Sequence, residues 1–398
     1  MNRNRVNKKR MGRARVLSRA AAGMLAAALC FQPMTALAGP AGDSSLTSSS
    51  SNAGPGGGSG SSNSGSTGSS GGTTSVSNGS VSAVTSGLGV YRVTENEGIG
   101  AIARGVDVSY WQQNVNWSQV ASDNVQFAML ATRFRGNVDP FFAMNAANAS
   151  QAGLRLGAYI YSYATSVEMA QQEADFVLNL IKDYPISFPV VFDAEDANTL
   201  GTLTQSQVSD VINAFCKRIQ DAGYYPMVYA NEYWIANKID MSKISYDIWV
   251  AKYQQKYTYS KTSMWQASNT GSVKGVNGNV DIDYLYKDYT QIIPGNTWRT
   301  IAGNRYYYQN HVMQKAAWIN DGQNWYYMNA AGNPSTGWLE LSGKKYYLEA
   351  DGHMITGWKT LDGGWRYFDA SGEQATGWRA VDGSWYFMAD NGLMQTGW

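Results

Sequence analysis

Six tryptophans recur at a constant spacing at the C-terminal end of this 398-residue sequence, at Trp298, Trp318, Trp338, Trp358, Trp378 and Trp398. An aromatic cluster follows each of the first five after seven to ten residues, and turn sequences such as Asp362-Gly363 lie between. A strict period of this length indicates a repeat array whose units are β-hairpins, each burying one face on the next. We therefore expect residues 294–398 to form an all-β hairpin-repeat solenoid.

The N-terminal end has the composition of a secretory signal peptide. Residues 1–38 contain eight basic residues and no acidic one, and an apolar stretch runs from Ala20 to Phe31. Ala36-Leu37-Ala38 then offers small residues at the positions that a signal peptidase reads. Residues 39–97 are dominated by Gly, Ser, Thr and Asn, which cannot bury enough surface to offset their ordering entropy. We expect a secreted protein with a disordered linker over 39–97.

Composition also excludes several kinds of site. The two histidines are His311 and His353, so residues 39–310 contain none, which excludes a Ser-His-Asp or Cys-His site and a His-rich zinc site there. We expect neither a metal nor a cofactor. Beyond residue 38 the chain has 23 basic and 30 acidic residues, a net charge of −7, which favours neither nucleic acid binding nor membrane insertion. Cys216 lies in a helical pattern and is expected to be buried.

Residues 98–293 alternate between strand-like and helix-like patterns. Apolar, β-branched or aromatic runs occur near 104–109, 125–131, 154–161, 187–193, 225–231, 246–251, 263–267 and 279–285. Helical patterns cover about 140–152, a segment that begins at Thr165 with Glu168 as a capping box, and a segment from Thr204 to Gly223. This alternation predicts an α/β fold with a closed parallel barrel. The last three strands leave little room for helices, so the barrel is expected to be irregular.

Four carboxylates lie at the predicted strand ends, where barrel enzymes collect their reactive groups. Asp107 ends the first strand, Asp193 and Glu195 end the fourth, and Asp281 lies on the eighth. The first and last strands of a closed barrel are neighbours, so Asp107 and Asp281 are expected to approach each other. Glycosidic bond cleavage requires one acid that keeps its proton beside one ionised carboxylate. Asp193 and Glu195, two residues apart after an apolar run, are suited to that pairing.

Aromatic residues surround these acids along the sequence and are suited to stacking on sugar rings. The expected substrate-binding residues are Tyr110, Trp111, Gln112, Tyr159, Tyr161, Trp249, Tyr253 and Trp265.

The motifs of this region resemble those of the family 25 glycoside hydrolases, the lysozyme-type muramidases. Asp107-Val108-Ser109-Tyr110-Trp111-Gln112 resembles their opening motif, and Phe192-Asp193-Ala194-Glu195 resembles their central acid pair. Trp249–Tyr253, Trp265-Gln266 and Gly278–Asp281 resemble their later strands. The resemblance implies an irregular (β/α)5β3 TIM-like barrel that cleaves between N-acetylmuramic acid and N-acetylglucosamine in peptidoglycan. It also implies that Glu195 is the proton donor and that Asp107, Asp193 and Asp281 surround it.

The tail resembles the choline-binding, or cell-wall-binding, repeats of Gram-positive surface proteins, in which aromatic cages hold a quaternary ammonium by cation–π attraction. The resemblance of the barrel implies a peptidoglycan glycan strand as substrate, and that of the tail implies choline-bearing teichoic acid or another wall polysaccharide as the partner of the repeats. The expected choline- or wall-binding residues are Trp318, Trp325, Tyr327, Trp338, Tyr347, Trp358, Trp365 and Trp378.

The sequence thus predicts a secreted peptidoglycan hydrolase bound to a Gram-positive-type cell wall. Two alternatives fit parts of it: a non-catalytic wall-binding or adhesion protein, and a carbohydrase acting on another wall polysaccharide. The acid set argues against the first, and the absence of acids between Phe188 and Phe192 argues against a chitinase-type barrel. Asp193 is left with three candidate roles: nucleophile, base, or a group that orients the substrate's own N-acetyl group.

Overall fold

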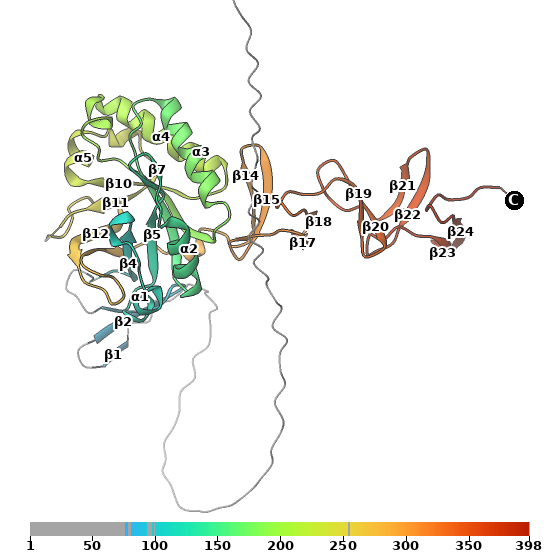
Figure 1. Cartoon of the computed structure of the whole chain (residues 1–398), viewed down its shortest axis with the longest axis horizontal. Helices are drawn as coiled ribbons and strands as arrows, with labels where there is room; N and C mark the ends of the chain where they lie inside the picture. Colours follow the sequence, from blue (N-terminus) through green and yellow to red (C-terminus); the bar gives the residue numbers. More distant parts are fainter. Residues whose placement is uncertain (1–75, 79–80, 94–97, 99, 254, 398) are drawn as a thin grey trace, which may run out of the picture. The chain divides into compact units, whose positions relative to one another are not determined.

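The computed structural model describes residues 76–78, 81–93, 98, 100–253 and 255–397 (Figure 1). The predicted signal peptide, residues 1–38, and residues 39–75 of the predicted linker lie outside the described residues.

Eight strands form a closed barrel at the positions that the sequence indicates. They are β4 (Ala103–Val108), β5 (Phe127–Ala131), β8 (Arg155–Tyr161), β9 (Ile186–Asp193), β10 (Pro226–Asn231), β11 (Asp247–Ala251), β12 (Thr262–Gly271) and β13 (Val280–Leu285). The order around the barrel is β10-β11-β12-β13-β4-β5-β8-β9. Pairing is parallel from β4 through β12, whereas β13 runs antiparallel to both neighbours, β12 and β4. The predicted closed barrel is therefore confirmed, with the last strand reversed.

Helices connect the first six barrel strands in turn. They are α1 (Trp117–Ser122), α2 (Phe142–Gln151), α3 (Val167–Ile181), α4 (Gln205–Asp221) and α5 (Glu232–Asn237). A capping box of Thr204 and Gln207 begins α4 at the predicted start of this helix, and Gly223 follows its end with a φ of 88°. The predicted start at Thr165 is wrong by one residue, because the side chain of Ser166 accepts the hydrogen bond from the Met169 amide that caps α3.

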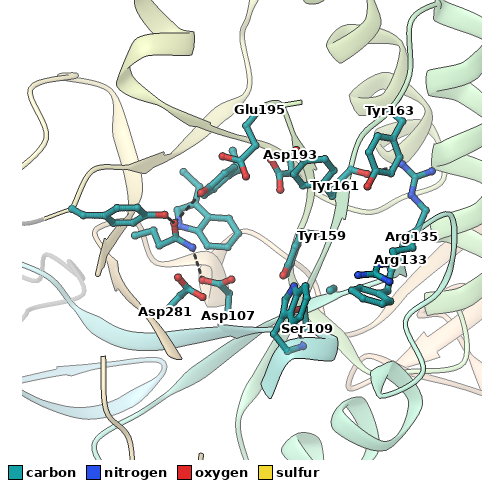
Figure 2. A pocket seen from close by; sticks show the side chains of 17 residues that line it. Asp107, Ser109, Arg133, Arg135, Tyr159, Tyr161, Tyr163, Asp193, Glu195 and Asp281 are labelled. Carbon is teal, nitrogen blue, oxygen red and sulfur yellow. Dashed lines mark hydrogen bonds between the residues drawn. The ribbon is translucent and has the colours of Figure 1, made fainter. Parts of the chain in front are cut away.

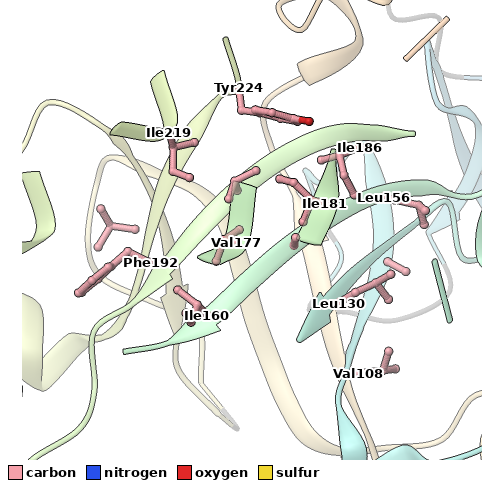
Figure 3. Packing of buried hydrophobic residues seen from close by; sticks show 14 of the residues in the cluster. Val108, Leu130, Leu156, Ile160, Val177, Ile181, Ile186, Phe192, Ile219 and Tyr224 are labelled. Carbon is pink, nitrogen blue, oxygen red and sulfur yellow. The ribbon is translucent and has the colours of Figure 1, made fainter. Parts of the chain in front are cut away.

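The barrel strands are buried on both faces. One face of each strand points into the barrel and the other points outward toward the helices. Phe188 and Val191 of β9 point into the barrel with Phe127 and Met129, whereas Val190 and Phe192 point outward toward the helices. Figure 3 shows this outer layer, in which Val177 and Ile181 of α3 and Ile219 of α4 pack over the sheet. Because side chains alternate along a strand, Asp193 continues the inward row of Val191.

The end of the predicted linker is wrong, because β1 (Val76–Asn78), β2 (Val81–Ser86) and β3 (Gly89–Val93) form an antiparallel three-stranded sheet inside it. Tyr91 of β3 is 1% exposed and belongs to the same apolar cluster as the outward-facing barrel residues. A bulky apolar side chain with such a partner surface offsets the ordering entropy of its strand. Strand β3 is therefore part of the packed structure.

The periodic tail folds into successive hairpins. The first unit has three strands, β14 (Thr297–Ile301), β15 (Asn304–Gln309) and β16 (Val312–Met313). Four two-stranded hairpins follow: β17 (Ala317–Asn320) with β18 (Trp325–Met328), β19 (Gly337–Leu341) with β20 (Lys344–Leu348), β21 (Gly357–Leu361) with β22 (Gly364–Phe368), and β23 (Gly377–Val381) with β24 (Ser384–Met388). Asp362-Gly363 has positive φ at both residues, 51° and 79°, the geometry of a tight hairpin turn. In each hairpin the periodic tryptophan pairs with an aromatic residue on the other strand, as Trp338 does with Tyr347.

The first hairpin packs on the barrel region. The Arg299 guanidinium lies 3.9 Å from the ring centroid of Tyr224 and 4.3 Å from that of Tyr308. The Tyr308 hydroxyl donates a 2.8 Å hydrogen bond to the Lys182 carbonyl at the end of α3. Ile301 also joins the apolar cluster that includes the outer barrel residues. The first hairpin of the repeat array is therefore also part of the packing around the barrel.

Among the described residues, no helix is long and apolar enough to cross a membrane.

Candidate active site

The four predicted acids meet at one end of the barrel. Asp193 is the last residue of β9, and Glu195 follows it two residues later. Asp107 on β4 is the register partner of Asp281 on β13, so the first and last strands bring these two carboxylates together as expected. Figure 2 shows Glu195 and Asp193 on one side of the cavity and Asp107 and Asp281 on the other.

The cavity between these acids has a volume of about 470 Å³. Its walls combine carboxylates with tyrosines, tryptophans and two arginines, a lining that suits a polar ligand with flat apolar faces. The lining residues are Asp107, Ser109, Trp111, Ala131, Arg133, Phe134, Arg135, Tyr159, Tyr161, Tyr163, Asp193, Glu195, Tyr229, Trp249, Tyr253, Gln266 and Asp281.

Burial disfavours ionisation of the acid pair after β9. Burial, followed by the charges of Glu195 and Asp196, raises the pKa of Asp193 well above its ordinary 3.8. Burial, followed by Asp281 and Asp196, also raises the pKa of Glu195 above its ordinary 4.5. Asp193 is 5% exposed and its Oδ1 has no hydrogen-bond partner among the described residues, whereas Glu195 is more exposed. The pair can therefore hold a proton at mildly acidic pH.

The second acid group lies on β4 and β13. Burial, followed by the charges of Asp281 and Asp283, raises the pKa of Asp107 well above 3.8. Burial raises the pKa of Asp281 to about 6. The Gln266 side-chain amide donates a 2.7 Å hydrogen bond to Asp107 Oδ2 and favours its ionised form. Gln266 in turn accepts hydrogen bonds from the hydroxyls of Tyr229 and Tyr253, each 2.8 Å long.

The sequence did not lead us to assign Gln266 or Asp283 to the site. Gln266 and Asp283 lie on the inward faces of β12 and β13, and Asp283 is fully buried with a 2.9 Å hydrogen bond from the Trp249 indole N–H. Burial, followed by the charge of Asp281, raises the pKa of Asp283 well above 3.8. The sequence could have indicated Asp283, since residues two apart on a strand share one face and Asp283 is two residues after Asp281.

An aromatic rim borders the cavity on the side of β6 (Arg133–Phe134) and β7 (Asn137–Val138), a short hairpin. Trp111 is 67% exposed and meets Phe134 edge to face at 5.6 Å. The Arg135 guanidinium lies 5.1 Å from the Phe134 ring centroid. Arg133 is fixed deeper by a 2.6 Å ion pair with Glu173. An exposed indole beside two guanidinium groups can stack on a sugar and attract an anionic substituent.

Five of the eight expected substrate-binding residues line the cavity: Trp111, Tyr159, Tyr161, Trp249 and Tyr253. The other three do not. Tyr110 stacks on Phe134 with ring centroids 4.1 Å apart, and Gln112 accepts a hydrogen bond from the Ser109 amide as part of a capping box. Trp265 is 1% exposed on the outward face of β12 and donates to the Lys252 carbonyl. These residues hold the loops and the core in place.

The described residues contain no group of three or more His, Cys, Asp or Glu side chains arranged to hold a metal ion.

Comparison with known proteins places this barrel in a family. The model of "Glycosyl hydrolases family 25" matches residues 106–276, the segment that carries Asp107, Asp193 and Glu195. The uncharacterized protein YegX of Escherichia coli is 31% identical over 189 residues, which cover 45% of this chain and 68% of YegX. The chain belongs to glycosyl hydrolase family 25. The predicted glycoside hydrolase is thereby confirmed.

A lysozyme and an endolysin are also among the similar proteins. Lysozyme M1 of Streptomyces globisporus is 30% identical over 195 residues, which cover 45% of this chain and 66% of that protein. The solved structure of the modular Cpl-1 endolysin in complex with a peptidoglycan analogue is 21% identical, with a TM-score of 0.38, over 74% of this chain and 94% of that one.

The tail of this family 25 protein matches two repeat models. The choline-binding repeat model matches residues 335–376, and the putative cell wall binding repeat model matches 317–333 and 376–394. Together with the periodic tryptophans, these matches confirm the predicted cell-wall-binding repeats.

The predicted repeat residues lie in unlike surroundings. Trp358, Trp365, Tyr386 and Met394 line an apolar cavity of about 280 Å³. Trp318 lies between Tyr327 and Tyr346, with ring centroids 5.3 and 5.0 Å away, and Trp325 is 47% exposed. Trp338 contacts Tyr347, and Trp378 contacts Phe387. Tyr386 and Met394 were not among the predicted residues. They line the Trp358 cavity from β24 of the next hairpin and from the segment that follows β24.

Proposed function

We propose that this protein is a secreted N-acetylmuramidase that cleaves peptidoglycan between N-acetylmuramic acid and N-acetylglucosamine and is held on the cell wall by its repeats. The single observation that carries the proposal is the meeting of Asp107, Asp193, Glu195 and Asp281 in one cavity of a family 25 barrel. The lysozyme names of relatives such as Lysozyme M1 support the substrate.

Glu195 is the proton donor in this proposal. Its raised pKa keeps a proton available, and its greater exposure brings it to the cavity, where a glycosidic oxygen can lie within hydrogen-bond reach. Transfer of that proton to the leaving oxygen leaves positive charge on the sugar ring as the bond breaks. A water molecule from solvent then adds its hydroxyl to the anomeric carbon, and its remaining proton goes to a site carboxylate, so that both products end in a hydroxyl and the site regains its proton.

Asp193 acts on that developing charge. Its buried Oδ1 has no hydrogen-bond donor, so the carboxylate gains most from a positive charge that arrives only in the transition state. Asp107 is oriented by Gln266, and Asp281 faces it across the β4–β13 pair. These two carboxylates are proposed to position the substrate on the far side of the reacting bond.

The remaining architecture supports delivery to an insoluble substrate. We assign the domains as a signal peptide over 1–38, a linker over residues 39 to about 75, an irregular (β/α)5β3 barrel, and a hairpin solenoid that begins at residue 294. The solenoid binds choline-bearing teichoic acid through its aromatic cages, and several weak sites on one chain give avidity. The choline-binding repeat match and the cavity at Trp358 support this ligand.

The test compares the wild type with Glu195→Gln on purified peptidoglycan, with release of reducing ends as the readout. Glu168→Gln is the matched control, because Glu168 is exposed on α3 and outside the cavity. We expect Glu195→Gln to abolish release and Glu168→Gln to retain it. Equal rates in all three proteins would exclude the proposed acid.

A further inference from the structure

Within the described part of the tail, tryptophans of four hairpins meet the hairpin that follows. At three of these interfaces the partner is a tyrosine: Trp298 with Tyr326 at 4.9 Å, Trp318 with Tyr346 at 5.0 Å, and Trp358 with Tyr386 at 4.7 Å between ring centroids. At the Trp338 interface the position equivalent to Tyr386, one repeat earlier in the sequence, is Arg366.

Arg366 places an internal cation on this tryptophan. Its guanidinium lies 5.0 Å from the Trp338 ring centroid, and the residue is 7% exposed. Nη2 lies 3.3 Å from Asp362 Oδ2, which also accepts a 3.2 Å hydrogen bond from the Trp338 indole N–H. Nη1 donates to the Asn391 carbonyl. These contacts fix the guanidinium in the place that an ammonium ligand would take over the indole face.

The whole lining of the Trp338 interface has changed along with Arg366. The Trp358 cavity is formed by Trp358, Trp365, Tyr386 and Met394, and the equivalent positions one repeat earlier are Trp338, Lys345, Arg366 and Gln374. These four line a separate cavity of about 310 Å³ together with Leu339, Glu340, Asp362 and Asn391. One tryptophan, one tyrosine and one methionine are thus replaced by two cations and an amide.

The equivalent set at Trp318, one further repeat back, is aromatic again: Trp318, Trp325, Tyr346 and Met354. At Trp298 a guanidinium again lies over the indole. The Arg305 guanidinium is 4.2 Å from the Trp298 ring centroid and donates a hydrogen bond to the Asp351 carbonyl. Among the described residues no such cation lies over Trp318 or Trp358. The chemistry therefore alternates along the array with a period of two repeats.

A quaternary ammonium ion is expected to bind the aromatic linings at Trp318 and Trp358 much more tightly than the lining at Trp338, which contains two cations. It cannot donate a conventional hydrogen bond, so its binding depends on π faces and on the absence of competing positive charge. At the Trp338 interface Arg366 takes the indole face, and like charges at short range repel. The two acids in this lining are each opposed by a cation, since Asp362 contacts Arg366 and Glu340 is the register partner of Lys345.

We propose that Arg366 and Arg305 close the Trp338 and Trp298 interfaces to quaternary ammonium ions, so that, of the four interfaces between described hairpins, those of Trp318 and Trp358 bind choline. Arg366 is thus a specificity-determining residue for the wall ligand. This inference rests on the proposed choline binding and narrows it. It also corrects the expectation that Trp338 and Tyr347 contribute to an occupied choline site.

Calorimetric titration of the full chain with choline tests the inference through the number of sites. The wild type is expected to bind two equivalents. Arg366→Tyr, or Lys345→Trp with Arg366→Tyr and Gln374→Met, is expected to add a third site. Tyr386→Arg, the reciprocal exchange, is expected to remove the Trp358 site and leave one. Near-ultraviolet circular dichroism of each variant checks that the hairpins remain folded.

A crystal structure of the wild type soaked in choline assigns the sites directly. Choline at Trp318 and Trp358, with Arg366 still over Trp338, supports the inference. Choline against Trp338, or an unchanged number of sites in a folded Arg366→Tyr chain and in a folded triple variant, overturns it while leaving choline as the ligand. The absence of choline binding in every chain would instead refute the proposed ligand, and the inference with it.

Discussion

Replacing Asp281 with Asn is expected to stabilise the folded protein at neutral pH while it reduces activity. Burial raises the pKa of Asp281 from 3.8 to about 6. Well below pH 3.8 this carboxyl is protonated in both the folded and the unfolded chain. As the pH rises through 6, the folded protein must ionise it in a buried site, so its contribution to the free energy of unfolding becomes unfavourable.

The size of the effect follows from the same pKa. A change from 3.8 to about 6 corresponds to at most about 3 kcal/mol, and partial exposure reduces this to about 1–2 kcal/mol. For a domain of this size that is about 2–8 °C in melting temperature. Asn removes the ionisation, so the variant should melt higher than the wild type at pH 7.5, with the difference shrinking as the pH falls from 6 toward 4.

Asp247→Asn provides a contrast of opposite sign. Burial alone would raise the pKa of Asp247, but hydrogen bonds from Lys287, Tyr225 and Tyr289 outweigh it and lower the pKa. Loss of this carboxylate should therefore destabilise the protein at pH 7.5, and less so as the pH falls through the folded-state pKa. Scanning calorimetry of the full chains at pH 4 and pH 7.5 measures the Asp281 effect, and a further scan below pH 3.8 measures the pH dependence of the Asp247 effect. If Asp281→Asn melted below the wild type at pH 7.5 by as much as at pH 4, the electrostatic reasoning would be refuted.

Three further predictions follow from the site and its supports. Glu195→Gln should lower kcat by about 10²–10⁴ without lowering the melting temperature, and the wild-type rate should fall as the pH rises through the raised pKa of Glu195; a pH profile unchanged on the alkaline side would contradict this. Trp111→Ala should raise KM more than it lowers kcat, whereas Tyr233→Ala, an equally exposed aromatic outside the cavity, should change neither; equal effects would argue against a stacking role for Trp111. A chain cut after residue 315 should keep a stable barrel, whereas a cut after residue 293 should lower its melting temperature, because the latter removes Arg299 and Tyr308; identical melting curves would show that the first hairpin does not support the barrel.

The strands and the acids were predictable because they depend on local pattern. The eight apolar runs fix the barrel, and the alternation of side chains along β9 and β13 directs Asp193 and Asp281 inward. The reversal of β13 was not predictable from composition, since the direction of a short strand depends on what lies between it and its neighbour.

The errors concern residues whose role depends on distant partners. Trp249 and Trp265 are both tryptophans in apolar strand sequences, so the sequence does not tell them apart. Trp249 points into the barrel, whereas Trp265 lies on the opposite face of its strand and packs in the layer outside the barrel. Gln266 gains its role only because Asp107, far away in the sequence, lies within 2.7 Å. Arg366 interrupts the aromatic pattern of the repeats together with Lys345 and Gln374, and only the position of Trp338 beneath its guanidinium gives that break a meaning.

The most direct test of the muramidase is the identity of the reducing end that it creates. Purified peptidoglycan is digested with the wild type, the products are reduced with borohydride, and the terminal residues are identified by mass spectrometry. The account predicts reduced N-acetylmuramic acid at the new ends, in amounts that disappear with Glu195→Gln. New ends carrying reduced N-acetylglucosamine, or no new ends from an intact and folded protein, would contradict it.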